Sequence, residues 1–339
     1  MPAQVAIAVD AMGGDAAPSV NVRGSLQALE ADRDLTLTLV GPEKTIRAEL
    51  ALHHSAESER LRIVHCEEVV SMDDHAVDAA RRKRASSIHV GMRLVKEGHA
   101  DAFLSAGNSG AVMAIALLEL GRLSGVERPA IVVKLPTTEG SVTLLDAGAN
   151  VDCRASHLSQ FAQMGDVYAR VIDGLSNPRV AVLSNGSEPH KGNELTRGAH
   201  ELLVKDSNLN YLGYVEGFDL FRGTADVVVC DGFVGNVALK TAEGLADTAF
   251  RWLRQQVRRD LFGLLGVFFL KRTLRKFRKT FDYQPYGAAP LLGIDGMVLI
   301  SHGSSTDTAI RNGILTAKRG VEQGFLQRIA DVMGKGQRQ

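Results

Sequence analysis

The sequence predicts an α/β protein in which helices cover both faces of a largely parallel sheet. Short β-branched and apolar segments alternate along the 339 residues with segments whose apolar residues recur every three or four positions. Strands that are apolar on both faces are typical of parallel sheets enclosed by helices. Glycine is also abundant, with 34 residues, against a usual share of roughly 7%. Many of these glycines directly follow the predicted strands.

The strands and helices alternate throughout the chain. The segments with strand composition are Val5–Val9, Leu35–Val40, Leu61–Val64, Ala102–Leu104, Ile131–Val133, Val142–Leu145, Val180–Leu183, Tyr211–Val215, Val227–Cys230 and Val298–Ile300. The segments with helical periodicity are about Ser19–Ala31, Glu43–His53, Val77–Glu97, Ser109–Leu120, His157–Ile172, Asn193–Lys205, Asn236–Arg258 and Thr306–Met333. We expect a single domain over residues 1–339 that includes an amphipathic helical insertion at 245–285.

Four predicted strands end in turns built from Gly, Asn, Ser or Asp. The turns are Asp10-Ala-Met-Gly-Gly-Asp15, Ser105-Ala-Gly-Asn-Ser-Gly110, Ser184-Asn-Gly-Ser187 and Asp231-Gly-Phe-Val-Gly-Asn236. A glycine turn that precedes a helix presents backbone N–H groups, which favour anionic ligands such as phosphate. In open parallel sheets ligands bind beyond the carboxyl ends of the strands, where these turns lie. Each turn taken alone is equally compatible with a βα connection that binds nothing.

The first two turns supply small polar candidates for an anion site. Hydroxyl, amide and backbone N–H groups all occur there just before a helix, and Ser109 is placed to cap that helix. The candidate ligands are Asp10, Gly13, Gly14, Ser105, Gly107, Asn108 and Ser109.

The later turns add charged candidates. Glu188, His190 and Lys191 are crowded into one glycine-bounded loop, where a lysine could pair with phosphate and a glutamate could orient it, or all could be solvated charges. Asp231 and Asn236 flank a pair of glycines, and Lys240 lies four residues beyond Asn236 on the same helix face. A further turn, His302-Gly-Ser-Ser305, offers His302 and Ser304.

The segment from Arg251 to Phe281 is strongly basic, although the formal net charge of the chain is zero. It holds ten basic residues and one acid, and its apolar residues follow an amphipathic helix pattern. A membrane surface, a subunit interface and a nucleic-acid patch are the alternatives. Lys and Arg beside a run of Phe and Leu favour the first two. The residues expected to contact lipid are Leu261, Phe262, Leu264, Leu265, Phe268 and Phe269.

Several common chemistries have no support in the sequence. We find no G-x-G-x-x-G after a strand, no P-loop, no H-E-x-x-H, no G-x-S-x-G and no paired C-x-x-C. Asp10 and Asp15 alone make a weak cation site, so no metal is expected. Three widely spaced cysteines indicate a reduced, cytoplasmic protein.

The chain resembles the bacterial phosphate acyltransferases of phospholipid synthesis from Val5 to about Ala330. The resemblance includes the turns at 10–15 and 105–110 and the segment from Asp231 to Lys240. The other matching motifs are Leu94-Val-Lys-Glu-Gly98, Glu127-Arg-Pro-Ala130, Asp146-Ala-Gly-Ala-Asn-Val-Asp-Cys153, Lys191-Gly192, Gly287-Ala-Ala-Pro-Leu-Leu-Gly293 and Ser301-His-Gly-Ser304.

The resemblance implies a Rossmann-like αβα sandwich similar to the isocitrate and isopropylmalate dehydrogenases and the phosphate acetyltransferases. It implies transfer of a long-chain acyl group from acyl-(acyl-carrier protein) to inorganic phosphate, without a cofactor and without nucleic acid. It also implies a homodimer, peripheral association with the inner face of an anionic membrane, and delivery of acyl phosphate to a membrane-bound glycerol-3-phosphate acyltransferase.

Both lines of reasoning lead to one hypothesis for the catalytic residues. Lys191 would bind phosphate, Asn236 would stabilise the oxyanion together with the amides near Asn108 and Ser109, and Asp231 would orient these groups. Glu188 and Lys240 would support them. A dehydrogenase, a short-chain phosphate acyltransferase that uses coenzyme A, and a non-catalytic membrane scaffold are the alternatives.

Overall fold

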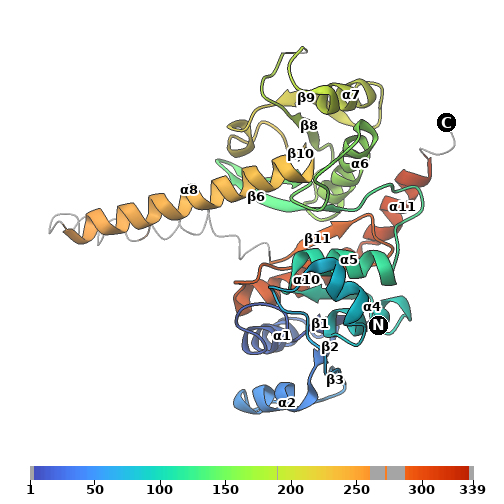
Figure 1. Ribbon diagram of the computed structural model, residues 1–339, viewed down its shortest axis with the longest axis vertical. Helices are drawn as coiled ribbons and strands as arrows, with labels where there is room; N and C mark the ends of the chain where they lie inside the picture. Colours follow the sequence, from blue (N-terminus) through green and yellow to red (C-terminus); the bar gives the residue numbers. More distant parts are fainter. Residues whose placement is uncertain (1–3, 189, 260–271, 273–286, 336–339) are drawn as a thin grey trace.

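The computed structural model describes residues 4–188, 190–259, 272 and 287–335. Its strands form two sheets, each with its own helices, and Figure 1 shows the two sheets as separate layers, one above the other. The helix α8 (Gly232–Arg259) extends sideways from between them. Over the described residues the chain therefore forms two α/β halves, and the long helix α8 projects from between them.

The first half is built on a seven-stranded sheet. In spatial order its strands are β3 (Leu61–His65), β2 (Leu35–Gly41), β1 (Val5–Asp10), β4 (Ala102–Ser105), β12 (Met297–Ile300), β11 (Ala289–Leu292) and β5 (Ala130–Ile131). The five strands from β3 to β12 are parallel, whereas β11 is antiparallel to both β12 and β5.

Helices cover both faces of this sheet. Residues Ile7 and Val9 of β1 pack on one face into a core shared with α1 (Ser19–Ala31) and α10 (Asp307–Glu322). On the opposite face Ala8 and Phe103 pack with α4 (Ser87–Lys96) and α5 (Ser109–Glu119). Burial on both faces explains why the strands are apolar at almost every position. The smaller helices α2 (Glu43–Leu52) and α3 (Ala76–Arg82) complete this half.

The second half contains a five-stranded sheet. Its spatial order is β6 (Val133–Thr137), β7 (Gly140–Leu145), β10 (Val227–Val229), β8 (Arg179–Leu183) and β9 (Asn210–Val215). β6 and β7 form an antiparallel hairpin, and the remaining pairs are parallel. The helices α6 (Ala155–Val171) and α7 (Glu194–Leu203) cover one face. Leu239 of α8 and the short 3₁₀ helix η1 (Asp219–Phe221) contribute to the core on the other face.

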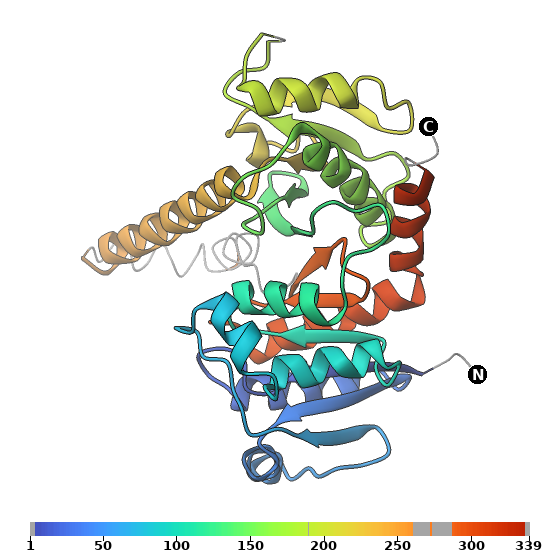
Figure 2. The same cartoon turned by 45° about the vertical axis from the view of Figure 1, so that its right-hand side comes forward.

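The last helix joins the two halves. The chain returns from α10 to α11 (Phe325–Lys335), which packs against α6 of the second half (Figure 2). The ring of Phe325 lies edge-on to Tyr168 of α6, with 6.1 Å between the centroids. A single buried cluster runs through both halves as a result.

The structure corrects several of the expected elements. The strands are largely parallel, as predicted, but they form two sheets that each include antiparallel pairing, and β11 was not expected from the sequence. The segment 77–97 forms two helices because Lys83 leaves the helical conformation and its Nζ bonds to the carbonyl oxygen of Val69 and to Asp74. The segment 306–333 also forms two helices, with Gly324 at a φ of 63° between them.

Candidate active site

Three turns of the first half meet at one edge of the seven-stranded sheet. They follow β1, β4 and β12, which are adjacent and parallel. The Ser105 hydroxyl donates to Asp10 Oδ2 at 2.7 Å and accepts from the Gly107 N–H at 3.0 Å. The Asp15 N–H donates to the carbonyl oxygen of Gly303 at 2.8 Å. The sequence prediction that strand-end turns gather at one edge therefore holds for this half.

Several candidates from the first two turns are buried. Asp10 and Ser105 are 2% and 0% exposed. A Cβ at Gly13 would lie 2.6 Å from the Gly107 nitrogen, so glycine is needed for the two turns to approach so closely. Burial raises the pKa of Asp10, and the bond from the Ser105 hydroxyl opposes that shift. Gly14, with a φ of 99°, packs against Ala106 and Gly303. These residues position the turns rather than line an open site.

Asn108 has a structural role at the start of α5. Its side-chain oxygen accepts from the Ala111 N–H at 3.0 Å, which caps the helix, so Asn108 and not Ser109 is the capping residue. Its Nδ2 donates to the carbonyl oxygens of Met72 and Asp74 at 3.1 and 2.9 Å. The neighbouring Ser109 is exposed and faces the cavity described below.

The second half contributes its own strand ends. The turns after β7, β10 and β8 lie side by side because these strands are adjacent and parallel. Asp146, which follows β7, is fully buried, and its carboxylate accepts from the backbone N–H groups of Ile131, Gly148, Ala149 and Asn150 and from the Asn150 side chain. The backbone N–H of Gly232 donates to the carbonyl oxygen of Asn150 at 2.7 Å. This loop therefore fixes the start of α8.

Asp231 and Asn236 belong to the first turns of α8. The segment 231–236 was expected as a turn, but α8 already begins at Gly232. The Asp231 carboxylate accepts from the Val234 N–H at 2.9 Å, as a helix-capping residue does. Asn236 is exposed and lies over Gly148, where a Cβ would be 3.6 Å from its side-chain Cγ. Gly148 has a φ of 133°, a conformation that favours glycine.

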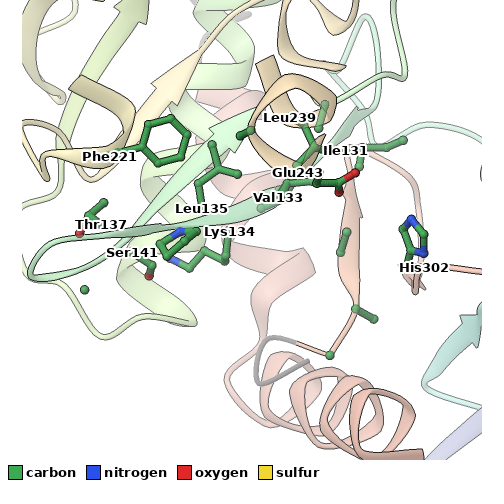
Figure 3. A pocket seen from close by; sticks show the side chains of 18 of the residues that line it. Ile131, Val133, Lys134, Leu135, Thr137, Ser141, Phe221, Leu239, Glu243 and His302 are labelled. Atoms are coloured by element: carbon green, nitrogen blue, oxygen red, sulfur yellow. The ribbon is translucent and has the colours of Figure 1, made fainter. Parts of the chain in front are cut away.

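A large cavity lies between the two halves and α8. Its volume is about 1420 Å³, and its lining includes Ser109 and His302 from the first half and Gly148 and Asn236 from the second. Figure 3 shows its lining side chains, with His302 to one side and Phe221 and Thr137 to the other. The apolar residues between them include Ile131, Val133, Leu135 and Leu239. One cavity thus joins a polar end to an apolar wall.

The polar end carries an imidazole and an ammonium group. The Nδ1 atom of His302 accepts from the Ser304 N–H at 3.2 Å and lies 2.8 Å from the Ser304 hydroxyl oxygen. An accepting Nδ1 leaves the proton of the neutral ring on Nε2, as a hydrogen-bond donor. Lys240 Nζ lies 2.8 Å from Glu243 Oε2, and both residues line the cavity.

The loop that carries Glu188, His190 and Lys191 follows β8 and is not part of the cavity lining. The Lys191 N–H donates to the carbonyl oxygen of Glu188 at 3.0 Å, and the side chains of both residues lie against Gly186. The loop shares the strand-end edge with Asp231 because β8 pairs with β10. The structure brings Asn236, Ser109, Lys240 and His302 to one cavity and leaves Lys191 outside its lining.

Sequence reasoning missed the loop after β7 and the apolar wall. Ala147 and Gly148 line the cavity, yet they were quoted only for the family resemblance. The segment Asp146-Ala-Gly-Ala-Asn150 directly follows a strand and contains glycine, so it has the same signal as the four turns that were chosen. No such signal marks the residues of β6, because an apolar residue in a strand sequence is equally compatible with a buried core and with the wall of a cavity.

Cys153 and Cys230 lie near Asp231 but are poor nucleophiles. Burial and the neighbouring Asp146 raise the pKa of the Cys153 thiol to about 12. Burial and Asp231 raise the pKa of Cys230 well above its usual value. Since the thiolate is the reactive form, neither side chain is activated for covalent catalysis at neutral pH.

Neither a metal cluster nor a membrane span is found in the part of the chain that the structure describes. Among those residues no group of three or more His, Cys, Asp or Glu side chains could hold a metal ion. No helix within the same ranges has the length and hydropathy needed to cross a membrane. The expected lipid contacts at Leu261, Phe262, Leu264, Leu265, Phe268 and Phe269 lie outside the described residues.

Comparison with known proteins gives close relatives by sequence. The profile of the family described as "Fatty acid synthesis protein" matches residues 5–328. The phosphate acyltransferase of Trichlorobacter lovleyi is 49% identical over 329 residues, which cover 97% of this chain and 94% of the relative. The phosphate acyltransferase of Geobacter sulfurreducens is 50% identical over 327 residues, which cover 96% of this chain and 94% of the relative.

Solved structures support the fold. A phosphotransacetylase from Streptococcus pyogenes has a TM-score of 0.64 at 20% identity, with 94% of each chain covered. A phosphotransacetylase from Staphylococcus aureus has a TM-score of 0.60 at 16% identity, with 93% of this chain and 94% of the other covered. The predicted similarity to the phosphate acetyltransferase fold is confirmed. The chain belongs to the fatty acid synthesis protein family, and the resemblance to phosphate acyltransferases that its motifs indicate is confirmed.

Proposed function

We propose that this protein is an acyltransferase that moves a long-chain acyl group from acyl carrier protein to inorganic phosphate. Its relatives are named phosphate acyltransferases, and its family is that of fatty acid synthesis proteins. The observation that carries the proposal is the cavity whose polar end contains Ser109, Asn236 and His302 and whose wall is apolar. The product, an acyl phosphate, would serve glycerol-3-phosphate acylation in phospholipid synthesis.

The reaction is a direct acyl transfer. A phosphate oxygen attacks the thioester carbonyl, a C–O bond forms, and the tetrahedral oxyanion expels the carrier's thiolate as the C–S bond breaks. Phosphate is already an anion at neutral pH, so positioning and charge stabilisation are the main requirements. The raised pKa values of the Cys153 and Cys230 thiols argue against a covalent acyl-cysteine intermediate.

The polar end supplies the groups for this step. The amide of Asn236 and the N-terminus of α5 at Ser109 stabilise the oxyanion, and the Nε2–H of His302 binds phosphate. Lys191 is the proposed phosphate ligand from the loop after β8, which would have to move toward the cavity to supply it, and Lys240 adds positive charge at the cavity. Asp231 orients Asn236 by capping α8, and Glu188 positions Lys191. The buried Asp10 and Ser105 hold the first two turns in place.

The apolar wall accommodates the acyl chain. Side chains of β6, η1 and α8 line it, and the volume of about 1420 Å³ exceeds that of common small-molecule pockets, which are on the order of 300–1,000 Å³. A short-chain phosphate acyltransferase would have no use for such a wall. Long acyl chains are therefore the preferred substrates.

The function is tested by trapping the product. The full chain is incubated with a long-chain acyl-carrier protein and phosphate, and acyl phosphate is converted with hydroxylamine to acyl hydroxamate. We expect hydroxamate formation that depends on both enzyme and phosphate, with acetyl-coenzyme A as a much poorer donor. Hydroxamate formation that is independent of phosphate would contradict the proposal, and efficient use of acetyl-coenzyme A would favour the short-chain alternative.

We also propose that the protein acts as a homodimer on the inner surface of an anionic membrane, where it delivers acyl phosphate to a membrane-bound acyltransferase. Exposed apolar side chains on α8, such as Leu245 at 69% and Trp252 at 61%, support a partner surface there. Charge reversal at Lys271, Arg272 and Arg275 is expected to abolish co-sedimentation with anionic vesicles while turnover in solution continues. Unchanged vesicle binding in this variant would exclude the basic segment as the lipid contact.

A further inference from the structure

A cluster of four consecutive cations ends α3 and forms the turn before α4. The cluster consists of Arg81, Arg82, Lys83 and Arg84, and we call it the basic turn. Arg81, Arg82 and Arg84 are exposed. The Arg84 side chain donates to the carbonyl oxygen of Arg81, and Arg93 of α4 donates to the carbonyl oxygen of Arg84 at 2.9 Å. These bonds hold the backbone of the basic turn in one conformation.

Three of the acidic residues near the basic turn, Asp74, Glu68 and Asp78, have partners other than its arginines. Asp74 pairs with Lys83 and accepts from the Ser71 N–H. Glu68 accepts from the Ala85 N–H at 2.8 Å, and Asp78 lies 3.4 Å from His75. Across the residues that the structure describes, no ion pair involves Arg81, Arg82 or Arg84. The three arginines of the basic turn are therefore exposed to solvent without an ion-pair partner among the described residues.

The basic turn is tied directly to the rim of the cavity. The loop before α3 is held by the Asn108 side chain, which donates to the carbonyl oxygens of Met72 and Asp74. The Met72 side chain lies against Gly303, where a Cβ would be 2.9 Å from the Met72 methyl carbon. Gly303 directly follows His302, and Asn108 directly precedes Ser109, so this loop borders two residues of the polar end.

The helix α3 spans the short distance from the rim to the basic turn. Its first residue, Ala76, packs on α5, where a Cβ at Gly110 would lie 3.1 Å from the Ala76 Cβ. A helix of seven residues is about 10 Å long at 1.5 Å per residue. Along this path two apolar side chains are exposed, Met72 at 44% and Val77 at 47%. An apolar centre beside a charged rim is the usual composition of a protein-binding surface.

We propose that the basic turn, together with Met72 and Val77, is the surface on which the acidic acyl carrier protein docks. The inference rests on the proposed function, which makes an acyl-loaded acidic protein the donor. A carrier bound here would place the thioester at the end of its flexible prosthetic arm beside Ser109 and His302. The exposed arginines complement its negative charge, and Met72 and Val77 contact it between the arginines and the cavity.

A lipid surface fits this patch less well. Membrane-surface helices combine Lys and Arg with several Trp, Phe or Leu side chains along one face. α3 has seven residues and no aromatic or leucine side chain. In addition, a carrier protein must reach the cavity from outside, and the basic turn borders its polar end.

The test compares two acyl donors in the full-length protein. The variant R81E/R82E is assayed with palmitoyl-carrier protein and with palmitoyl-pantetheine, which has the same thioester and no protein. We expect KM for the carrier-bound donor to rise roughly tenfold or more, with kcat nearly unchanged. KM for palmitoyl-pantetheine should stay at the wild-type value. Added salt should raise the wild-type KM for the carrier far more than that of the variant.

The matched control is K44E/K205E, which changes the net charge by the same amount at two exposed positions away from the cavity. If this control raises KM for the carrier as much as R81E/R82E, the basic turn is not the docking surface. An equal rise in KM for both donors would also overturn the assignment. So would loss of binding to anionic vesicles in R81E/R82E with an unchanged KM for the carrier-bound donor. If the wild-type protein uses neither donor, the proposed function itself is wrong.

Discussion

Replacement of Asn236 by alanine is expected to lower kcat for acyl phosphate formation by about 10²–10³-fold, the loss typical of a removed oxyanion donor. Asn236 is exposed at the polar end of the cavity, and its amide lies over Gly148. Within the residues that the structure describes, its side chain makes no hydrogen bond or ion pair, so the folded state should keep its stability. The measurement is steady-state kinetics with the hydroxylamine trap, combined with thermal unfolding.

Two further variants separate catalysis from a general disturbance of α8. Asn236→Asp keeps the shape of the side chain but places negative charge where the oxyanion develops, so its kcat should be at least as low as that of the alanine variant. Thr241→Ala removes a polar group from an exposed position of the same helix outside the cavity lining and should retain wild-type kcat. A kcat for Asn236→Ala within twofold of wild type would remove Asn236 from the catalytic step.

The strand-end turns could be predicted because their signal is local. A buried strand followed by glycine and small polar residues is recognisable within about ten positions, and the turns observed after β1, β4 and β8 match that pattern. The turn expected after β10 is instead occupied by the start of α8. Which turns meet is not a local property. Asp10 and Ser105 bond across 95 positions, and the assignment of strands to two sheets depends on contacts of that kind.

The chemical role of a turn residue was also harder to predict than its place. Asn108 and Asp231 have the side chains expected of ligand-binding residues, but both use them to cap helices. Ser, Asn and Asp are favoured at helix starts for the same hydrogen-bonding reason that makes them candidates for a site. Only the three-dimensional arrangement shows that Asn236 and Ser109 face the cavity while Asp10 and Ser105 are buried.

The break between α3 and α4 shows a tertiary contact overriding local preference. The residues from Val77 to Glu97 have good helix propensity and no glycine until Gly91. Lys83 nevertheless leaves the helix because its ammonium group bonds to Asp74 and to the Val69 carbonyl oxygen, both from the preceding loop. This break creates the basic turn, so the proposed docking surface was not recognisable from periodicity alone.

Gly235→Ala is expected to destabilise the protein strongly, because the start of α8 is packed against the loop after β7. A Cβ at Gly235 would lie 1.9 Å from the carbonyl oxygen of Asp146 and 3.0 Å from Cys230 Sγ. The Asp146 backbone cannot move easily, since its N–H donates to the carbonyl oxygen of Cys230 and its buried carboxylate accepts from four backbone N–H groups. We expect the free energy of unfolding to fall by about 3 kcal/mol or more.

Gly244→Ala is the matched control, because the same substitution on the same helix meets open space. No heavy atom lies within 4 Å of the Cβ that it adds. Alanine in a helix interior is favoured over glycine by roughly 0.5–1 kcal/mol, so this variant should be slightly more stable than wild type. Urea unfolding followed by circular dichroism measures both changes.

The same two variants should also differ in catalysis. Because Asn236 follows Gly235, displacement of α8 should lower kcat in Gly235→Ala and not in Gly244→Ala. Equal stability of the two variants would show that α8 can shift without disturbing the Asp146 loop, and would leave the position of Asn236 without its structural explanation.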